Sequence, residues 1–162
     1  MIFIIQNIKM NSQLMENNLH VADCIEDFIE KTKRGEKINQ HFLYVYGDEW
    51  DCKEFIKNIM EYIGPNCKRV SLEDLSDFKY HSKPNPTVTN NCIIMQKYGD
   101  LKRNNKDKIG CNIKEIVGKD TTISSGEICN HKANVIFAST IDGVRELLKD
   151  AGIRRRAILI KV

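Results

Sequence analysis

The strongest constraint on the fold is a strand-glycine-helix unit at residues 41–65. Residues 41–46 form an apolar, aromatic run that ends at Gly47, as a buried strand would. Apolar residues then recur at helical spacing until Gly64-Pro65 stops the pattern; they are Phe55, Ile56, Ile59, Met60 and Ile63. A buried strand that leads directly into an amphipathic helix is typical of α/β proteins.

Strand-like and helix-like segments alternate along the rest of the chain. The other predicted elements are helices at 20–34, 113–117 and 142–149, strands at 69–72, 92–96, 134–139 and 157–162, a hairpin from 121–124 and 127–129, and a short helix capped at Ser71-x-x-Asp74. Loops are predicted around Pro84 and Pro86 and over the polar stretch Lys102–Lys108. This alternation predicts a mainly parallel sheet covered on both faces, in one domain at 41–162 after a helical lead-in at 1–40.

The composition excludes several classes of protein. No apolar run approaches the length of about eighteen residues that suggests a membrane-spanning helix. The opening Met-Ile-Phe-Ile-Ile-Gln lacks a basic lead-in and is too short for a signal peptide. The six cysteines form no Cys-x-x-Cys pair, and Cys129-x-His131 is the nearest approach to a metal pair. We therefore expect an intracellular protein in a reducing compartment, with neither a disulfide framework nor a zinc site.

Charge is distributed unevenly along the chain. Residues 1–100 contain 12 Lys/Arg and 15 Asp/Glu, whereas residues 101–162 contain 13 Lys/Arg and 7 Asp/Glu. A basic second part favours an anionic partner, of which nucleic acid is the commonest, although basic surfaces also serve solubility alone.

The segment after residue 46 has the spacing of a phosphate-binding loop but not its chemistry. Gly47 and Lys53 stand at the separation of the first glycine and the lysine in Gly-x4-Gly-Lys-Ser/Thr. Cys52 replaces the second glycine, and Glu54 replaces the hydroxyl that helps to hold magnesium. Four carboxylates and one ammonium give residues 47–54 a net charge of −3; the carboxylates belong to Asp48, Glu49, Asp51 and Glu54.

Two structures are compatible with this segment. Like charges at this range cost on the order of 1 kcal/mol per pair even in water, so a triphosphate would be repelled from a loop built of these residues. The alternative is an ordinary strand-turn-helix, in which the acidic first turn of the helix complements the helix dipole.

Three later segments, at 113–120, 132–140 and 152–162, closely resemble the second half of superfamily 3 helicases, the ring-forming replication ATPases of viruses, phages and plasmids. The resemblance is nearest to the poxvirus- and phage-type primase-helicases and runs from about His41 to Val162, with residues 92–97 at the place of the family's metal-binding strand. It implies a P-loop NTPase fold of the AAA+-like kind, a three-layer sandwich around a mainly parallel sheet.

The resemblance also implies roles for residues near a nucleotide. Lys53 would hold the β and γ phosphates, in a degenerate loop with Gly47 and Glu54. Gln96-Lys97 stand where the family has the acidic pair for magnesium and the attacking water, so hydrolysis lacks its metal ligands. Ser139-Thr140 fall at the polar sensor, where the Thr140 hydroxyl could still form a hydrogen bond.

Other roles that the resemblance implies concern partners. Arg155 and Arg156 match the paired arginines that reach the nucleotide of a neighbouring subunit. The hairpin corresponds to the element that follows single-stranded nucleic acid in the ring's channel, and the candidate contacts are Lys119, Ser125, Gly126, His131 and Lys132.

Each of these roles has a structural alternative. Arg154 to Arg156 also fit a solvated basic run before an edge strand, and Lys102–Lys108 fit a disordered surface loop better than a nucleic-acid contact. His131 fits a surface histidine. Trp50 could stack on a base, but it fits a partner surface or a cap on the core better.

The sequence therefore predicts a degenerate superfamily 3 helicase-like domain of a viral or mobile-element replication protein, impaired in ATP hydrolysis. Its expected partners are single-stranded DNA or RNA, the subunits of a replication ring or further copies of itself, in the cytoplasm or nucleus of a host. The alternative is an active but divergent replicative helicase or ATPase, in which Glu54 or Asp51 holds magnesium. ATP and magnesium are expected cofactors only if the divergent loop binds them.

Overall fold

A single five-stranded parallel sheet forms the centre of the protein. The computed structural model describes residues 15–71, 85–118, 122–124, 127–129 and 131–162. The strands lie in the order β2-β3-β6-β1-β7, and every neighbouring pair is parallel. Their bounds are β1 (Phe42–Tyr46), β2 (Cys67–Arg69), β3 (Cys92–Lys97), β6 (Asn134–Ser139) and β7 (Ala157–Lys161). The predicted α/β class and parallel sheet are therefore confirmed.

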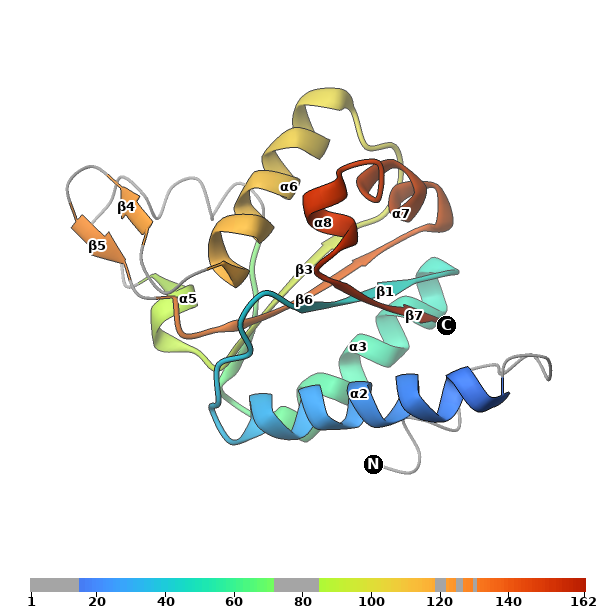
Figure 1. Ribbon diagram of the computed structural model, residues 1–162, viewed down its shortest axis with the longest axis horizontal. Helices are drawn as coiled ribbons and strands as arrows, with labels where there is room; N and C mark the ends of the chain where they lie inside the picture. Colours follow the sequence, from blue (N-terminus) through green and yellow to red (C-terminus); the bar gives the residue numbers. More distant parts are fainter. Residues whose placement is uncertain (1–14, 72–84, 119–121, 125–126, 130) are drawn as a thin grey trace.

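Helices cover both faces of this sheet (Figure 1). One face carries α2 (Met15–Lys33) and α3 (Glu49–Ile63), and the other carries α6 (Arg103–Val117), α7 (Ile141–Leu147) and α8 (Ala151–Arg154). Because side chains alternate along a strand, Leu43 and Val45 of β1 enter the first core whereas Phe42 and Tyr44 enter the second. The molecule is thus a three-layer sandwich with two apolar cores.

The helix α2 belongs to the same packed unit as the sheet. Ile25, Phe28 and Ile29 are each 2% exposed or less and lie in one cluster with the core-facing residues of α3 and β1. The sequence analysis assigned this helix to a helical lead-in at 1–40. Its apolar stripe completes the core on one face of the sheet.

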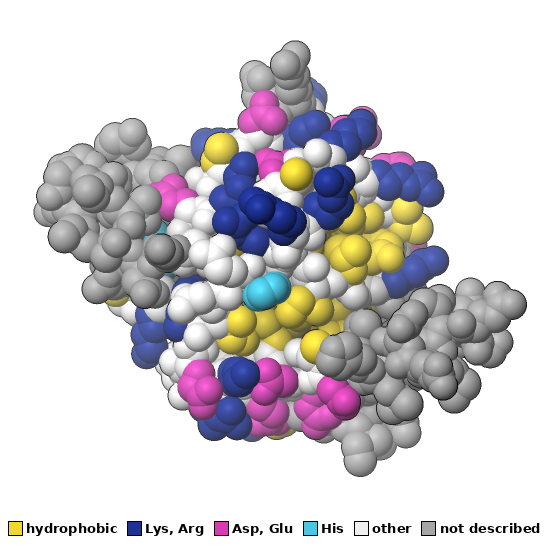
Figure 2. Space-filling view, in the orientation of Figure 1, with side chains coloured by type: hydrophobic (Ala, Val, Ile, Leu, Met, Phe, Trp, Pro, Cys, Tyr) yellow, Lys and Arg dark blue, Asp and Glu magenta, His cyan; other side chains and the backbone are white. Residues whose placement is uncertain are grey.

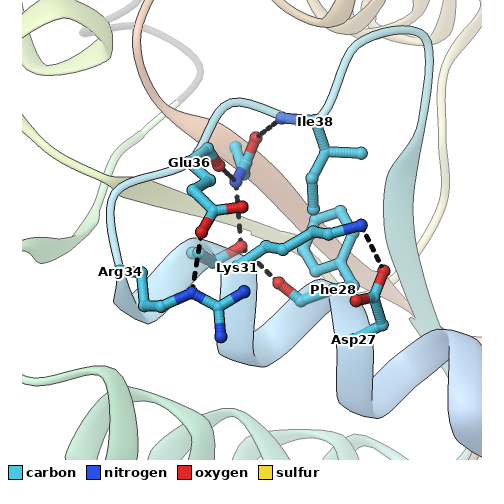
Figure 3. A network of polar contacts seen from close by, with 8 residues as sticks. Asp27, Phe28, Lys31, Arg34, Glu36 and Ile38 are labelled. Atoms are coloured by element: carbon cyan, nitrogen blue, oxygen red, sulfur yellow. Dashed lines mark hydrogen bonds and ion pairs between the residues drawn. The ribbon is translucent and has the colours of Figure 1, made fainter.

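A buried asparagine, Asn134, connects the end of α2 to the amino edge of the sheet, and two of the residues that it bonds to, Glu36 and Ile38, are labelled in Figure 3. The Asn134 amide nitrogen donates to Thr32 Oγ1 and to the Glu36 carbonyl, both at 2.9 Å. Its oxygen accepts from the Ile38 N–H at 2.8 Å. Asn134 is 1% exposed, so its bonds fix the chain between α2 and β1 without help from solvent.

Two segments that were predicted as loops are helical. Lys102–Lys108 was expected to be an exposed loop, but all of it after Lys102 is the first part of α6. The apolar side chains of α6 that face the core start at Ile109, so its polar beginning carried no helical pattern. Pro86 begins the short helix α5 (Pro86–Thr89), whose N-cap Asn85 accepts from the Thr87 N–H at 3.0 Å.

The predicted hairpin is present outside the main sheet. Its strands β4 (Thr122–Ser124) and β5 (Glu127–Cys129) pair antiparallel, with Ile123 opposite Ile128. The turn residues Ser125-Gly126 and the predicted helix after Ser71 lie outside the described residues. None of the described helices is long and apolar enough to cross a lipid bilayer.

Candidate functional site

The sheet has a topological switch point between β1 and β6. These strands are neighbours, but the chain leaves β1 for α3 on one face and leaves β6 for α7 on the other. In open α/β sheets, such a divergence forms a crevice at the carboxyl ends of the strands, where ligands commonly bind. Here the switch point lies between Gly47-Asp48 and Ser139-Thr140, two of the places that the sequence singled out.

Gly47 is required by the packing at the end of β1. Its φ of +152° disfavours other residues, and an added Cβ would lie 2.3 Å from the Val162 carbonyl oxygen. Val162 approaches because its N–H donates to the Tyr46 carbonyl at 3.0 Å, which continues the pairing of β7 with β1. Packing against Val162 therefore explains why glycine stands at position 47, whether or not a phosphate binds there.

Residues 49–53 form the first turns of a helix and not an open loop. Asp48 is the N-cap of α3, and its Oδ1 accepts from the Trp50 N–H at 2.9 Å. Glu49 and Asp51 lie in the first turn, where carboxylates complement the helix dipole. This geometry matches the strand-turn-helix alternative, because no loop of backbone N–H groups surrounds the space between Gly47 and Lys53.

Cys52 lies beneath this turn as a core residue. Its side chain is 0% exposed, and its thiol donates to the Ser139 carbonyl at 3.7 Å. Burial, together with the nearby carboxylate of Asp48, raises the pKa of the Cys52 thiol to about 12. The side chain that replaces the second glycine thus joins α3 to the end of β6.

Lys53 is already paired within its own helix. Its Nζ lies 2.5 Å from Glu49 Oε1 and 5.5 Å from the centre of the Tyr98 ring. The side chains of Lys53 and Glu49 are both about half exposed, at 52% and 51%, so the pair is accessible to solvent. Sequence reasoning missed Tyr98, although an aromatic residue directly after β3 and before Gly99 marked a strand end.

The sensor positions also form internal hydrogen bonds. Ser139 is buried and its Oγ lies 2.7 Å from the Tyr44 hydroxyl, while Thr140 caps α7 by accepting from the Gly143 N–H at 3.4 Å. Gln96 accepts from the Tyr98 hydroxyl at 3.1 Å. Since β6 lies between β1 and β3, these residues share the carboxyl edge with the start of α3.

The two arginines at the end of α8 lie at the opposite, amino edge of the sheet. Arg156 is half-buried and donates to Gln40 Oε1 at 3.1 Å and to the Gly152 carbonyl at 2.8 Å. Arg155 is exposed and forms no side-chain hydrogen bond or ion pair with the described residues. Arg155 is therefore the arginine of the pair that is available to another molecule, whereas Arg156 holds the entry to β7.

The candidate nucleic-acid contacts are only partly described. Lys119, Ser125 and Gly126 lie outside the described residues. His131 was expected at the surface, but it is 9% exposed and its Nδ1 lies 2.7 Å from Thr87 Oγ1. The surface assignment was wrong because α5 covers this ring. Lys132 is exposed at the amino edge, and its N–H donates to the Thr87 carbonyl at 2.8 Å.

Trp50 is 74% exposed on the first turn of α3, so it does not cap the core.

Within the described part of the chain, no group of three or more His, Cys, Asp or Glu side chains is placed to hold a metal ion. No model of a protein family matches the chain, and no curated protein matches it. The functional argument therefore depends on the residues themselves.

Proposed function

We propose that this chain is a degenerate superfamily 3 helicase-like domain of the P-loop NTPase class, from a viral or mobile-element replication protein. It does not hydrolyse ATP efficiently and acts through contacts with nucleic acid or with other subunits. One observation carries the proposal: the residues at the expected nucleotide positions share one edge of the sheet, but carboxylates and internal hydrogen bonds occupy that edge.

The strand order supports the assignment of the positions. Ser139-Thr140 on β6 lie between the start of α3 and Gln96 on β3, so the loop, sensor and metal positions of the resemblance fall in a row. A sensor between the other two could contact both a nucleotide and its attacking water.

Electrostatics supports the loss of hydrolysis. A helix N-terminus attracts phosphate through its free N–H groups and positive dipole end, but Asp48 already bonds to this one and Glu49 and Asp51 add negative charge. Lys53, the cation closest to these acids in the sequence, is paired with Glu49. Gln96 and Lys97 supply no carboxylate for magnesium.

The other side of the molecule supports a role in contacts. Lys and Arg side chains gather over α6 and α8 (Figure 2). Arg154 and Arg155 are exposed there without an ion pair among the described residues, and Lys132 is exposed at the same amino edge. Such groups attract phosphates, and release of counterions then drives binding.

A thermal-shift experiment with ATP and magnesium tests the loss of function. At millimolar ATP we expect the midpoint of unfolding to change by less than about 1 °C, and Lys53→Ala to behave like the unchanged protein. A clear upward shift that Lys53→Ala abolishes would favour the active, divergent ATPase. The triple variant Glu49→Ala, Cys52→Gly, Glu54→Thr supplies the second glycine and the hydroxyl of the phosphate-binding motif and removes one carboxylate. We expect ATP and magnesium to raise its unfolding midpoint in a way that depends on Lys53.

Binding of single-stranded oligonucleotides tests the contact role. We expect affinity for oligothymidylate or oligouridylate to fall more than about tenfold between 50 and 200 mM salt. Arg155→Ser and Lys132→Ser should each reduce the salt slope by about one, with the exposed Lys57→Ser on α3 as a matched control. If the affinity does not depend on salt, or if neither oligothymidylate nor oligouridylate binds, nucleic acid is removed from the proposed function.

A further inference from the structure

The strand β7 leaves one edge of the sheet open. It is the last strand in the order, and among the described residues only β1 pairs with it. Seen from this side, exposed hydrophobic side chains lie between the basic group over α6 and α8 and the acidic side chains over α2 (Figures 1 and 2). The strand contains no proline and no irregularity that would block pairing.

Backbone geometry identifies the groups on the open side. Phe42 N–H donates to the Arg156 carbonyl and Val162 N–H donates to the Tyr46 carbonyl, so the even-numbered residues of β7 face β1. Backbone groups alternate in direction along a strand. Ala157, Leu159 and Lys161 therefore direct their N–H and carbonyl groups outward, and no hydrogen bond to another described residue uses them.

The side chains along this edge have a defined pattern. Leu159 is 39% exposed in the middle of the strand, and Ile158 and Ala157 are half-buried. Positive charge lies at both ends, with Arg154 and Arg155 before the strand and Lys161 at its end. None of the three cations is ion-paired with a described carboxylate. The edge is thus apolar in the middle and basic at both ends.

This charge pattern opposes pairing between two copies of β7. An antiparallel pair of identical strands would place Lys161 of one copy near the arginines of the other, and a parallel pair would align identical cations. Charges on edge strands commonly prevent such self-association. The pattern favours a strand with carboxylates at its ends.

We infer that β7 is a docking edge for an extended peptide segment of another protein, apolar in its centre and acidic at its ends, which adds a sixth strand to the sheet. Main-chain hydrogen bonds to Ala157, Leu159 and Lys161 provide the affinity, and the terminal carboxylates select against other strands by pairing with the cations. This inference does not depend on the fate of the nucleotide site.

In the test, the full chain is titrated with the acetylated, amidated peptide Glu-Asp-Val-Thr-Val-Thr-Val-Asp-Glu, and NMR follows the backbone amide signals of the chain. We expect saturable shift changes at Ala157, Leu159 and Lys161 that weaken with salt, and no binding of the charge-reversed peptide Lys-Arg-Val-Thr-Val-Thr-Val-Arg-Lys. Leu159→Pro removes both the outward-facing N–H and the leucine side chain, so it should weaken binding by about fivefold or more; Leu159→Ala removes the side chain but keeps the N–H, so it should weaken binding less. Far-UV circular dichroism checks that both variants fold.

The role of charge is tested with the double variant Arg154→Ser, Arg155→Ser, which should weaken binding of the acidic peptide. The control Lys57→Ser, on α3 in the opposite helical layer, should leave binding unchanged. Any of four results overturns the inference. The chemical shifts of the three edge amides could stay unchanged at millimolar peptide, or the charge-reversed peptide could bind equally well. The three amides could exchange hydrogen slowly in the free chain, or an oligonucleotide could shift them when the peptide does not. Slow exchange would mean that the edge is already paired, either within the chain or between copies.

Discussion

At the scale of single residues, the polar side chains that contribute most to stability are those whose hydrogen bonds water cannot replace. Asn134 satisfies three backbone or hydroxyl partners inside the protein, and water cannot replace it at 1% exposure. Lys53 is the opposite case, because its pair with Glu49 is half exposed and exposed ion pairs contribute little to stability. A polar side chain that bonds to other residues therefore contributes very differently to stability at a buried and at an exposed position.

Asn134→Ala tests this contrast. We expect it to lower the free energy of unfolding by about 3 kcal/mol, since the Ile38 N–H and the Glu36 carbonyl lose their buried partner. Urea denaturation followed by circular dichroism measures the change. Asn105→Ala, an exposed position on α6, should change stability by less than about 0.5 kcal/mol. Equal effects of the two substitutions would contradict the structural role of Asn134.

At the scale of elements, the sequence predicted those with an apolar pattern of their own. The strands β1, β3, β6 and β7 fall within a residue or two of the predicted ranges, because each is a short apolar run bounded by polar residues or glycine. The short β2 was predicted at 69–72 but covers Cys67–Arg69, where only Cys67 is buried. The helix α8 was missed because it has one turn and a single buried side chain, Ile153.

The candidate site could be predicted only in part. Motif spacing located Gly47 and Lys53, and the resemblance located Thr140; all three lie at one edge of the sheet. It could not show that α3 begins at Glu49, because capping by Asp48 and the burial of Cys52 are properties of the folded chain. His131 was misplaced for a similar reason, since the sequence does not show that α5 packs over it.

The helix α8 depends on Asp150, which both caps it and joins it to α6. Asp150 Oδ1 accepts from the N–H groups of Gly152 and Ile153, and Oδ2 lies 2.6 Å from Lys114 Nζ. The bond from Lys114 lowers the pKa of the Asp150 carboxyl below its usual value of 3.8. A lowered pKa in the folded state stabilises the protein above pH 3.8, and that stabilisation is lost as pH falls through the folded pKa.

Asp150→Asn should therefore be less stable than the unchanged chain at neutral pH, with a difference that shrinks as pH falls below about 4. Asparagine retains the cap, so Asp150→Ala should be less stable again at every pH. Thermal unfolding at a series of pH values measures both. A stability difference between Asp150→Asn and the unchanged chain that is constant over pH would show that the ion pair has no role.

At the scale of the whole molecule, the balance of acidic and basic groups differs between the two helical layers. Acidic side chains with some cations among them lie over α2, whereas cations gather over α6 and α8 on the other face of the sheet (Figure 2). The start of α3 adds the carboxylates of Glu49 and Asp51. The apolar cores do not follow this division, because α2 is packed into one of them. The balance of surface charge thus differs between the two helical layers, while the interior remains one unit.

Residues 41–162 alone should consequently fail to form a stable domain. Removing α2 exposes the core residues that Ile25, Phe28 and Ile29 cover, and the single change Phe28→Ala should already cost about 3–4 kcal/mol. Thermal unfolding and limited proteolysis of the shortened chain measure the effect. A cooperative transition at the midpoint of the full chain would restore the boundary at residue 41.

The position of β1 in the sheet has a consequence for biosynthesis. Both of its neighbours, β6 and β7, lie far downstream in the sequence, so a nascent chain on the ribosome presents β1 without partners until residues 134–161 have been translated. An apolar strand that waits in this way is a natural substrate for chaperones, and slow elongation upstream of residue 134 should lower the soluble yield.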